Sequence, residues 1–148
     1  AALRRLGHQP LLMELKAVRD DDHLLAVFSH DGHYGAVAKS NFTTLRYREP
    51  VYRSLRELAM SYFEGYFNLE YEKTLRSYSK LIRLSSFDRL NWTVEDSAVD
   101  IIVESIDRAQ HYALCTEKMI ASLQPVDERS YQAALSGSNP AGLYRPEK

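Results

Sequence analysis

One short segment, DDDHLLAVF at residues 20–28, combines residue types that proton-transfer chemistry uses. Three consecutive aspartates precede His23, and an apolar run typical of a β-strand follows it. A histidine in this position can act as a general base, bind a metal, or simply be a polar residue at a strand end. Aspartates in a row usually form a solvated loop, which favours the third interpretation. The segment by itself still leaves all three interpretations open.

The turn after this strand decides which side chains face His23. Two strand-like segments flank Asp31-Gly32, a dipeptide that is typical of β-hairpin turns. A three-residue loop places Asn41 one diagonal away from His23 on the same face of the sheet. A two-residue loop shifts the register by one residue, so that Ser40 faces His23 instead. We therefore expect either Asn41 or Ser40 to orient the imidazole.

An imidazole held in one tautomer can convert a cysteine into a thiolate at neutral pH, which makes it the base of a nucleophilic triad. Cys115 is the only cysteine in the chain, and it lies near the predicted end of a helical segment. There a buried structural cysteine is the expected interpretation. A nucleophile is instead expected at a helix N-terminus, where the dipole lowers the thiol pKa. The only helix predicted before His23 is one that ends within residues 1–7.

The other histidines are weaker candidates. A zinc site at the hairpin tip would use His23, His30, Asp31 and His33. Residues at a hairpin tip are usually just exposed, however. His111 and Cys115 have the i, i+4 spacing of two ligands on a helix, but no further ligand accompanies them. The sequence therefore predicts no metal and no other cofactor.

Two groups of side chains could contact nucleic acid. Aromatic residues within 62–67 could stack on bases, although their spacing is that of a packed helix face. Four arginines between residues 46 and 56 have Glu49 and Glu57 among them as partners for ion pairs. The whole chain carries 19 basic and 20 acidic residues, so it has no basic field to attract phosphates. We expect no nucleic-acid partner.

Length and composition indicate one ordinary domain. The chain has 148 residues, enough to bury a core without disulfides. It contains no apolar run of the roughly 20 residues that a membrane helix requires, and no signal peptide. A single cysteine fits a reducing compartment. We expect a cytoplasmic protein that does not bind membranes.

Hydrophobic periodicity predicts an α+β fold with strands first and helices later. The predicted elements are a helix end at 1–7, strands at 10–18, 23–29 and 34–39, and helices at 55–67, 93–106 and 116–123 with a continuation after Pro125. Ser54 and Glu57 form a capping box for the first long helix. The second is expected to begin at Thr93 and to bury Val94, Ala98, Ile101, Ile102 and Ile106. Residues 74–92 are predicted to be mostly irregular with a short helical piece.

Six strings within residues 1–95 recur in one known group of proteins. They are AALRRLG, PLL, DDDH, GAVAKSN, LRYREPVY and EKTLRSYS, with RYREPVYR the most specific stretch. Together they resemble a bacterial group of transglutaminase-like proteins in the papain-like cysteine-enzyme superfamily. The resemblance implies a partial transglutaminase-like core at residues 1–49, followed by a helical extension packed on it at 50–135. Residues 136–148 are expected to form a flexible tail, because they are rich in Gly, Pro and Ser.

The resemblance also implies a site and an activity. The catalytic cysteine would open the helix that ends at residues 1–7, which places it before Ala1 and makes this chain a fragment of a longer enzyme. His23 would be the base, Asn41 would complete the set, and Asp22 would support it. The implied reaction is acyl transfer or hydrolysis of a peptide or amide through a thioester. The alternative is a non-catalytic module that binds a protein partner through its helical half.

Overall fold

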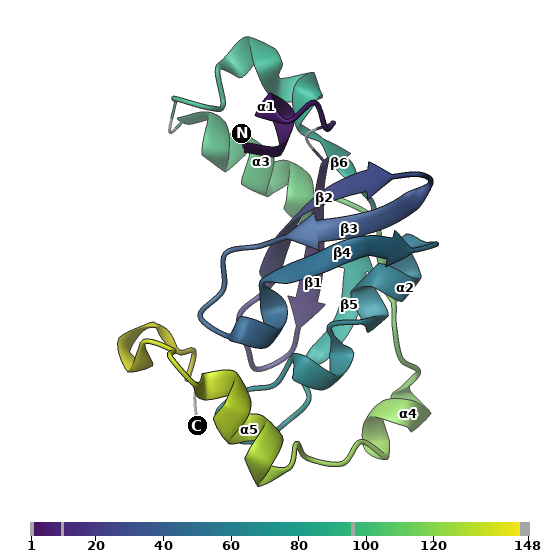
Figure 1. Ribbon diagram of the computed structural model, residues 1–148, viewed down its shortest axis with the longest axis vertical. Coiled ribbons are helices and arrows are strands. Elements are labelled where there is room, and N and C mark those ends of the chain that lie inside the picture. Colours follow the sequence, from purple (N-terminus) through teal and green to yellow (C-terminus); the bar gives the residue numbers. More distant parts are fainter. Residues whose placement is uncertain (1, 10, 96, 146–148) are drawn as a thin grey trace.

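The computed structural model describes residues 2–9, 11–95 and 97–145, and within them the fold is mixed α+β, as the sequence predicts. An antiparallel sheet with strand order β4-β3-β2-β1-β5-β7 lies at its centre, and β6 also pairs with β1 (Figure 1). The strands are β1 (Leu11–Ala17), β2 (His23–His30), β3 (His33–Val37), β4 (Tyr47–Tyr52), β5 (Leu75–Ser79), β6 (Ile82–Arg83) and β7 (His111–Ala113).

The helices lie around this sheet. They are α1 (Ala2–Arg5), α2 (Leu55–Met60), α3 (Ser97–Asp107), α4 (Glu117–Ala121) and α5 (Glu128–Leu135), with 3₁₀ turns η1 (Thr43–Leu45), η2 (Phe63–Gly65), η3 (Leu84–Leu90) and η4 (Pro140–Gly142). In Figure 1, α1 and α3 lie above the sheet, and α5 lies below it. Among the described residues, no helix combines the length and the apolar character needed to cross a bilayer.

The turn between β2 and β3 has two residues, because His30 pairs directly with His33. Asp31 and Gly32 both have positive φ, 47° and 75°, as a type I′ turn requires. The two-residue alternative is therefore confirmed, and the three-residue loop is wrong. Continued along the strands, this register would place Ser40 opposite His23, but β3 already ends at Val37.

The predicted Ser54 cap at the start of α2 is present, but Glu57 binds the amide of the residue before the cap and does not close the capping box. Ser54 Oγ accepts a hydrogen bond from the Glu57 amide at 3.1 Å, and the Glu57 carboxylate accepts one from the Arg53 amide at 2.7 Å. The predicted length of the helix is wrong, because α2 ends at Met60. Arg48 of β4 donates hydrogen bonds to both the hydroxyl and the carbonyl oxygen of Ser61, at 2.9 and 3.1 Å. The Ser61 carbonyl, directly after the end of α2, is therefore bonded to a strand.

The aromatic stripe after α2 is buried even though it does not continue the α-helix and contains only the 3₁₀ turn η2. Its members are Tyr62, Phe63, Tyr66 and Phe67, each no more than 7% exposed. Tyr62, Phe63 and Tyr66 share a cluster with fully buried residues of the sheet, and Phe67 belongs to a second cluster. The sheet residues are Met13, Leu15, Leu25, Val27 and Ala36. Each buried large apolar side chain of this kind contributes roughly 1.5–3 kcal/mol to stability. Periodicity therefore predicted burial correctly and the backbone incorrectly.

Residues 50–135 contain more strand than the sequence indicated. Residues 74–92, predicted to be mostly irregular, form β5, β6 and η3, and the predicted boundary after residue 49 falls inside β4. The helix expected from Thr93 begins at Ser97 instead. Its residues Ala98, Ile102 and Ile106 are buried as expected, whereas Val94 is 78% and Ile101 45% exposed. The predicted helices after Thr116 and Pro125 are confirmed as α4 and α5.

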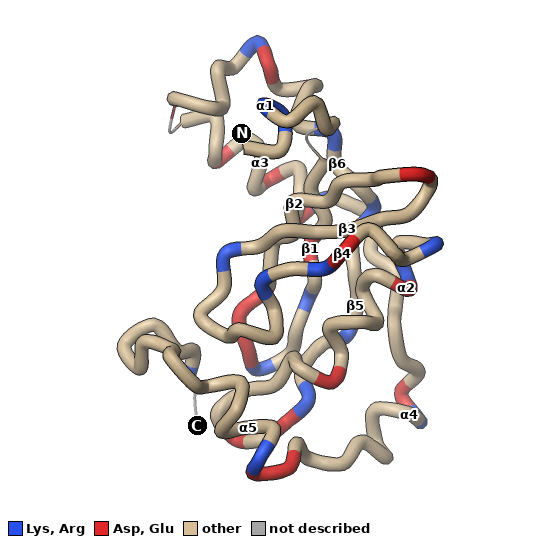
Figure 2. Tube along the Cα trace, in the orientation of Figure 1, with Lys and Arg blue, Asp and Glu red and all other residues tan. Residues whose placement is uncertain are grey.

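Charged residues of both signs are spread along the chain (Figure 2). Several of them join segments that are distant in sequence. Arg4 forms a bidentate pair with Asp88 at 2.6 and 2.7 Å, which links α1 to η3. Such exposed pairs contribute little free energy, because water and salt screen the two charges. Burial of the apolar core therefore dominates the stability of the fold.

Candidate active site around His23

A cavity of about 280 Å³ lies beside the start of β2. Four parts of the chain line it: the turn before β2, the loop after β3, the segment after η2, and the C-terminal segment. The lining residues are 20–23, 39–42, Leu45, Tyr66, Phe67, Gly142 and Tyr144. The structure thus brings all the predicted site residues, His23, Asp22, Ser40 and Asn41, around one cavity.

The imidazole of His23 is held by a backbone carbonyl. Its Nε2 lies 3.1 Å from the carbonyl oxygen of Leu45, and its ring meets the edge of the Tyr66 ring with centroids 6.3 Å apart. A carbonyl can only accept, so Nε2 must carry the proton in this contact. In the neutral ring Nδ1 then keeps its lone pair. The tautomer fixed here is the one in which Nδ1 can accept a proton.

Burial also favours the neutral imidazole. Desolvation lowers the pKa of His23 below its ordinary value, and the hydrogen bond to Leu45 opposes this in part by raising it. A neutral imidazole at physiological pH is the form that a general base requires.

Neither expected partner orients His23. Within the described residues, no hydrogen bond joins the imidazole to Ser40 or Asn41: Ser40 Oγ instead accepts one from the Phe42 amide at 3.1 Å. The Asn41 side chain binds the backbone of Asn139, with its oxygen and its nitrogen each 2.8 Å from a main-chain atom. Because β3 ends at Val37, both residues lie in a loop, where the strand register no longer sets their direction.

The three aspartates hold the turn that positions His23. Asp22 accepts a hydrogen bond from the Ala17 amide at 2.8 Å and lies 3.5 Å from the Lys16 ammonium. The support predicted for Asp22 is thus a contact with β1, not with the imidazole. The Asp21 carbonyl accepts a hydrogen bond from the Tyr66 hydroxyl at 2.5 Å. These contacts fix the backbone immediately before His23.

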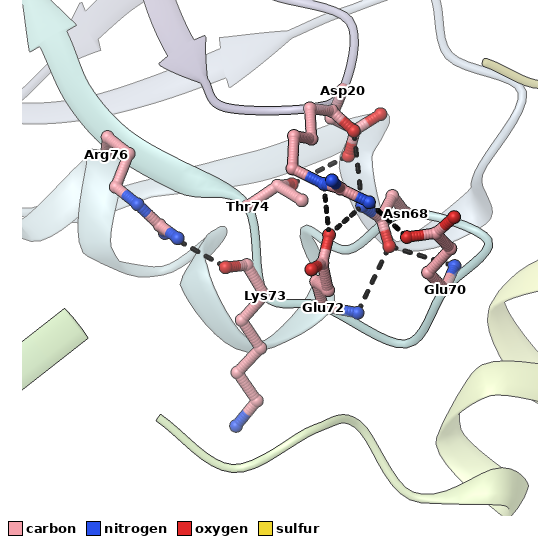
Figure 3. A network of polar contacts seen from close by, with 8 residues as sticks. Asp20, Asn68, Glu70, Glu72, Lys73, Thr74 and Arg76 are labelled. Atoms are coloured by element: carbon pink, nitrogen blue, oxygen red, sulfur yellow. Dashed lines mark hydrogen bonds and ion pairs between the residues drawn. The ribbon is translucent and has the colours of Figure 1, made fainter. Parts of the chain in front are cut away.

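Asp20 connects the turn to a second loop, and Figure 3 shows the side chains that meet there. Its carboxylate accepts a hydrogen bond from the Thr74 hydroxyl at 2.7 Å, and burial raises the pKa of Asp20. Asn68, which is 2% exposed, donates to the Arg19 carbonyl at 3.2 Å and to the Glu72 carboxylate at 2.7 Å. Asn68 could not be predicted from the sequence, because most of its partners are backbone groups and one of them, the Arg19 carbonyl, lies in a turn 49 residues away.

The remaining chemistry-bearing residues lie elsewhere. Cys115 is buried in the core, as expected for a structural cysteine, but it lies between β7 and α4 and not in a helix. His111 lies in β7, so its spacing to Cys115 is not helical. Its two ring nitrogens face acceptors, the Glu14 carboxylate and the Ala109 carbonyl, each at 2.8 Å. His111 therefore ties β7 to β1.

The tip of the hairpin is exposed. The side chains of His30 and Asp31 are 69% and 89% accessible and lie 3.4 Å apart. Within the described part of the chain, no three His, Cys, Asp or Glu residues come together in a way that could hold a metal ion.

Comparison with known proteins found no family model that matches the chain and no matching curated relative. Interpretation of the cavity therefore depends on its own geometry and on the residues that the sequence supplies.

Proposed function

We propose that this chain carries the histidine part of a transglutaminase-like thiol site, with His23 as general base. The observation that carries the proposal is the contact between His23 Nε2 and the Leu45 carbonyl, which leaves Nδ1 free to accept a proton beside a cavity. The cysteine thiol, which the resemblance places before Ala1, would lose its proton to Nδ1. The core at residues 1–49 would then be the part of a papain-like fold that positions the base.

The reaction follows from ordinary thiol chemistry. The thiolate attacks the carbonyl carbon of a peptide or amide, and the carbon–nitrogen bond breaks as the departing amine takes the proton from the imidazolium. The product is a thioester on the enzyme and a free amine. Water or another amine then attacks the thioester and regenerates the thiol. The partner of the imidazole is the Leu45 backbone carbonyl and not the expected side chain of Asn41 or Ser40. The carbonyl would hold the same tautomer.

The experiment uses the protein extended to include the residues encoded before Ala1. Its acylation by a reactive amide or ester probe is measured by mass spectrometry. We expect His23→Ala to slow acylation by about 100-fold or more, the usual contribution of a general base. His30→Ala, which changes an exposed histidine at the hairpin tip, is the matched control and should be silent. Acylation of His23→Ala at the wild-type rate would refute the proposal.

A second candidate function is protein binding through the helical half. Its support is a group of exposed apolar residues on α3, namely Val99, Ile101 and Val103, each between 44% and 48% accessible. A Val99→Lys, Val103→Lys double variant should keep the fold, because both side chains face solvent. If the double variant abolishes the biological activity of the protein while His23→Ala retains it, the binding function is favoured over the enzymatic one.

A further inference from the structure

The C-terminal segment is bound through its main chain. Asn41 Oδ1 accepts a hydrogen bond from the Asn139 amide, and Asn41 Nδ2 donates one to the Asn139 carbonyl oxygen, both at 2.8 Å. Both distances are typical of well-formed hydrogen bonds. A carboxamide is one of the few side chains that can pair with the donor and the acceptor of one residue at once. The contact therefore recognises a peptide backbone and not a particular side chain.

The bound segment continues along the His23 cavity. Asn139 is in an extended conformation, with φ −88° and ψ 113°, and η4 follows it. Gly142 lies against Asn41: a Cβ atom built on this glycine would be 3.4 Å from Asn41 Nδ2. Gly142 and Tyr144 then line the cavity together with His23. The segment that Asn41 binds at Asn139 thus contributes Gly142 and Tyr144 to the wall of the proposed active site.

The segment is anchored before it reaches the cavity. Tyr131 of α5 stacks on Tyr71 with ring centroids 4.1 Å apart and on Phe67 at 5.8 Å. Phe67 itself lines the cavity. Packing of α5 therefore keeps Asn139 close to Asn41, which corresponds to a high effective concentration of the segment at this position. An exposed, hydrogen-bonded segment held in this way can leave without disturbing the main core.

We propose that Asn41 binds the backbone of a peptide substrate and that residues 139–144 occupy this subsite as an internal competitor. The proposal rests on the proposed function and specifies its substrate class: a peptide that presents the N–H and C=O of one extended residue to Asn41. Asn41 is then a binding residue, which differs from the imidazole-orienting role expected from the sequence. The native segment would limit access to His23 until a peptide displaces it.

The decisive variant is Asn139→Pro in the full chain. Proline has no amide hydrogen, so this change removes the bond to Asn41 Oδ1 at an exposed position outside the core. It also removes the Asn139 side chain, whose oxygen accepts a hydrogen bond from the Ala141 amide at 3.1 Å. Asn139→Ser is the matched control, because serine keeps the amide hydrogen and offers a capping oxygen.

Two readouts test the variant. The first is carbethoxylation of His23 by diethyl pyrocarbonate, followed by peptide mass spectrometry with exposed His30 as the internal reference. The second is binding of a fluorescent peptide with the sequence of residues 137–145, GSNPAGLYR, measured by anisotropy. We expect Asn139→Pro to react at His23 and to bind the peptide about tenfold more readily than wild type, because a tethered competitor acts at up to millimolar effective concentration. Asn139→Ser should behave as wild type.

Adding Asn41→Ala to Asn139→Pro should abolish peptide binding while the circular dichroism spectrum stays unchanged. Equal peptide binding with and without Asn41, or no gain in either readout for Asn139→Pro, would overturn the proposal. Neither readout involves a thiol or turnover. If the Asn139→Pro readouts fail but His23→Ala slows acylation as expected, only the role of Asn41 is rejected. If the Asn139→Pro readouts succeed but His23→Ala is acylated at the wild-type rate, only the role of His23 is rejected.

Discussion

At the scale of single residues, the backbone decides what the side chains can do. His23 is oriented by a carbonyl, the turn before it is held through the Ala17 amide and the Asp21 carbonyl, and Asn41 binds main-chain atoms of Asn139. His23, Ser40 and Asn41 could be predicted to lie near one another from their types and spacing, and all three line one cavity. Their hydrogen-bond partners could not be predicted, because those partners are backbone groups, which every residue carries.

The pKa of His23 makes a prediction about stability. Because its folded-state pKa lies below the ordinary 6.5, the unfolded chain binds a proton more readily than the folded chain just below that pH. The free energy of unfolding should therefore fall as the pH drops through 6.5 toward the folded-state pKa. Above pH 6.5 His23 is neutral in both states, so it should add no pH dependence there. Urea titrations between about pH 5 and pH 8 on wild type and His23→Gln measure the difference.

The variant should lose this part of the pH dependence, while the contributions of the other titrating groups remain. A chemical-shift titration of the His23 ring protons checks the same point directly. A midpoint at or above 6.5 would contradict the assignment of a desolvated imidazole.

At the scale of elements, local signals could be predicted and long-range pairing could not. The Asp31-Gly32 turn and the Ser54 cap of α2 depend on residues within four positions of each other, so their types suffice. β5 has the sequence LRSYS, which lacks a clear apolar pattern. Its Ser79 is nevertheless fully buried, because its hydroxyl accepts a hydrogen bond from the Glu14 amide at 2.9 Å. A local sequence pattern could not predict this hydrogen bond, because Glu14 and Ser79 lie 65 residues apart in the sequence.

The approach of β4 to β3 leaves no room for a side chain at Gly35. A Cβ atom there would lie 2.7 Å from Phe28 Cζ, 2.8 Å from the Arg48 carbonyl oxygen and 2.9 Å from the Pro50 nitrogen. Two of these neighbours are backbone atoms and cannot rotate away. We expect Gly35→Ala to lower the free energy of unfolding by about 1–3 kcal/mol, as measured by urea titration.

Gly137→Ala provides a contrasting control. No atom lies within 4 Å of a Cβ built at Gly137, so only its positive φ of 74° opposes the change. A smaller effect at Gly35 than at Gly137 would show that β4 does not pack against β3 as described.

At the scale of the whole molecule, the C-terminal residues form a unit that joins the rest through aromatic contacts. Phe67, Val126, Tyr131 and Ala134 form a small buried cluster separate from the main core. Helix α5 is also tied to the loop between η2 and β5, where the Tyr71 hydroxyl donates a hydrogen bond to the Glu128 carboxylate at 2.7 Å. Small clusters of this kind open at lower free energy than the central core. The segment that reaches the His23 cavity is therefore held by one group of rings and by the two hydrogen bonds between Asn41 and Asn139.

We expect Tyr131→Ala to release this unit without unfolding the sheet. Loss of the stacked ring should raise hydrogen exchange across residues 128–142, because α5 then loses its aromatic anchor and the segment after it keeps only exposed hydrogen bonds such as the one to Asn41. Amides of β1 and β2 should keep their protection, since their core does not include Tyr131. Exchange measured by mass spectrometry distinguishes the two regions. A uniform rise over the whole chain would mean that the unit and the sheet open together.

The position of β1 has a consequence for synthesis on the ribosome. β1 pairs on one side with β2, which follows it closely in sequence, and on the other with β5 and β6, which are made much later. The β1–β4 meander can assemble as it emerges, yet one edge of β1 stays unpaired until residues 75–83 leave the tunnel. An open edge of this kind invites pairing between nascent chains. Slow translation between residues 53 and 83 would prolong that exposure, so codon choice in this stretch should influence the yield of soluble protein.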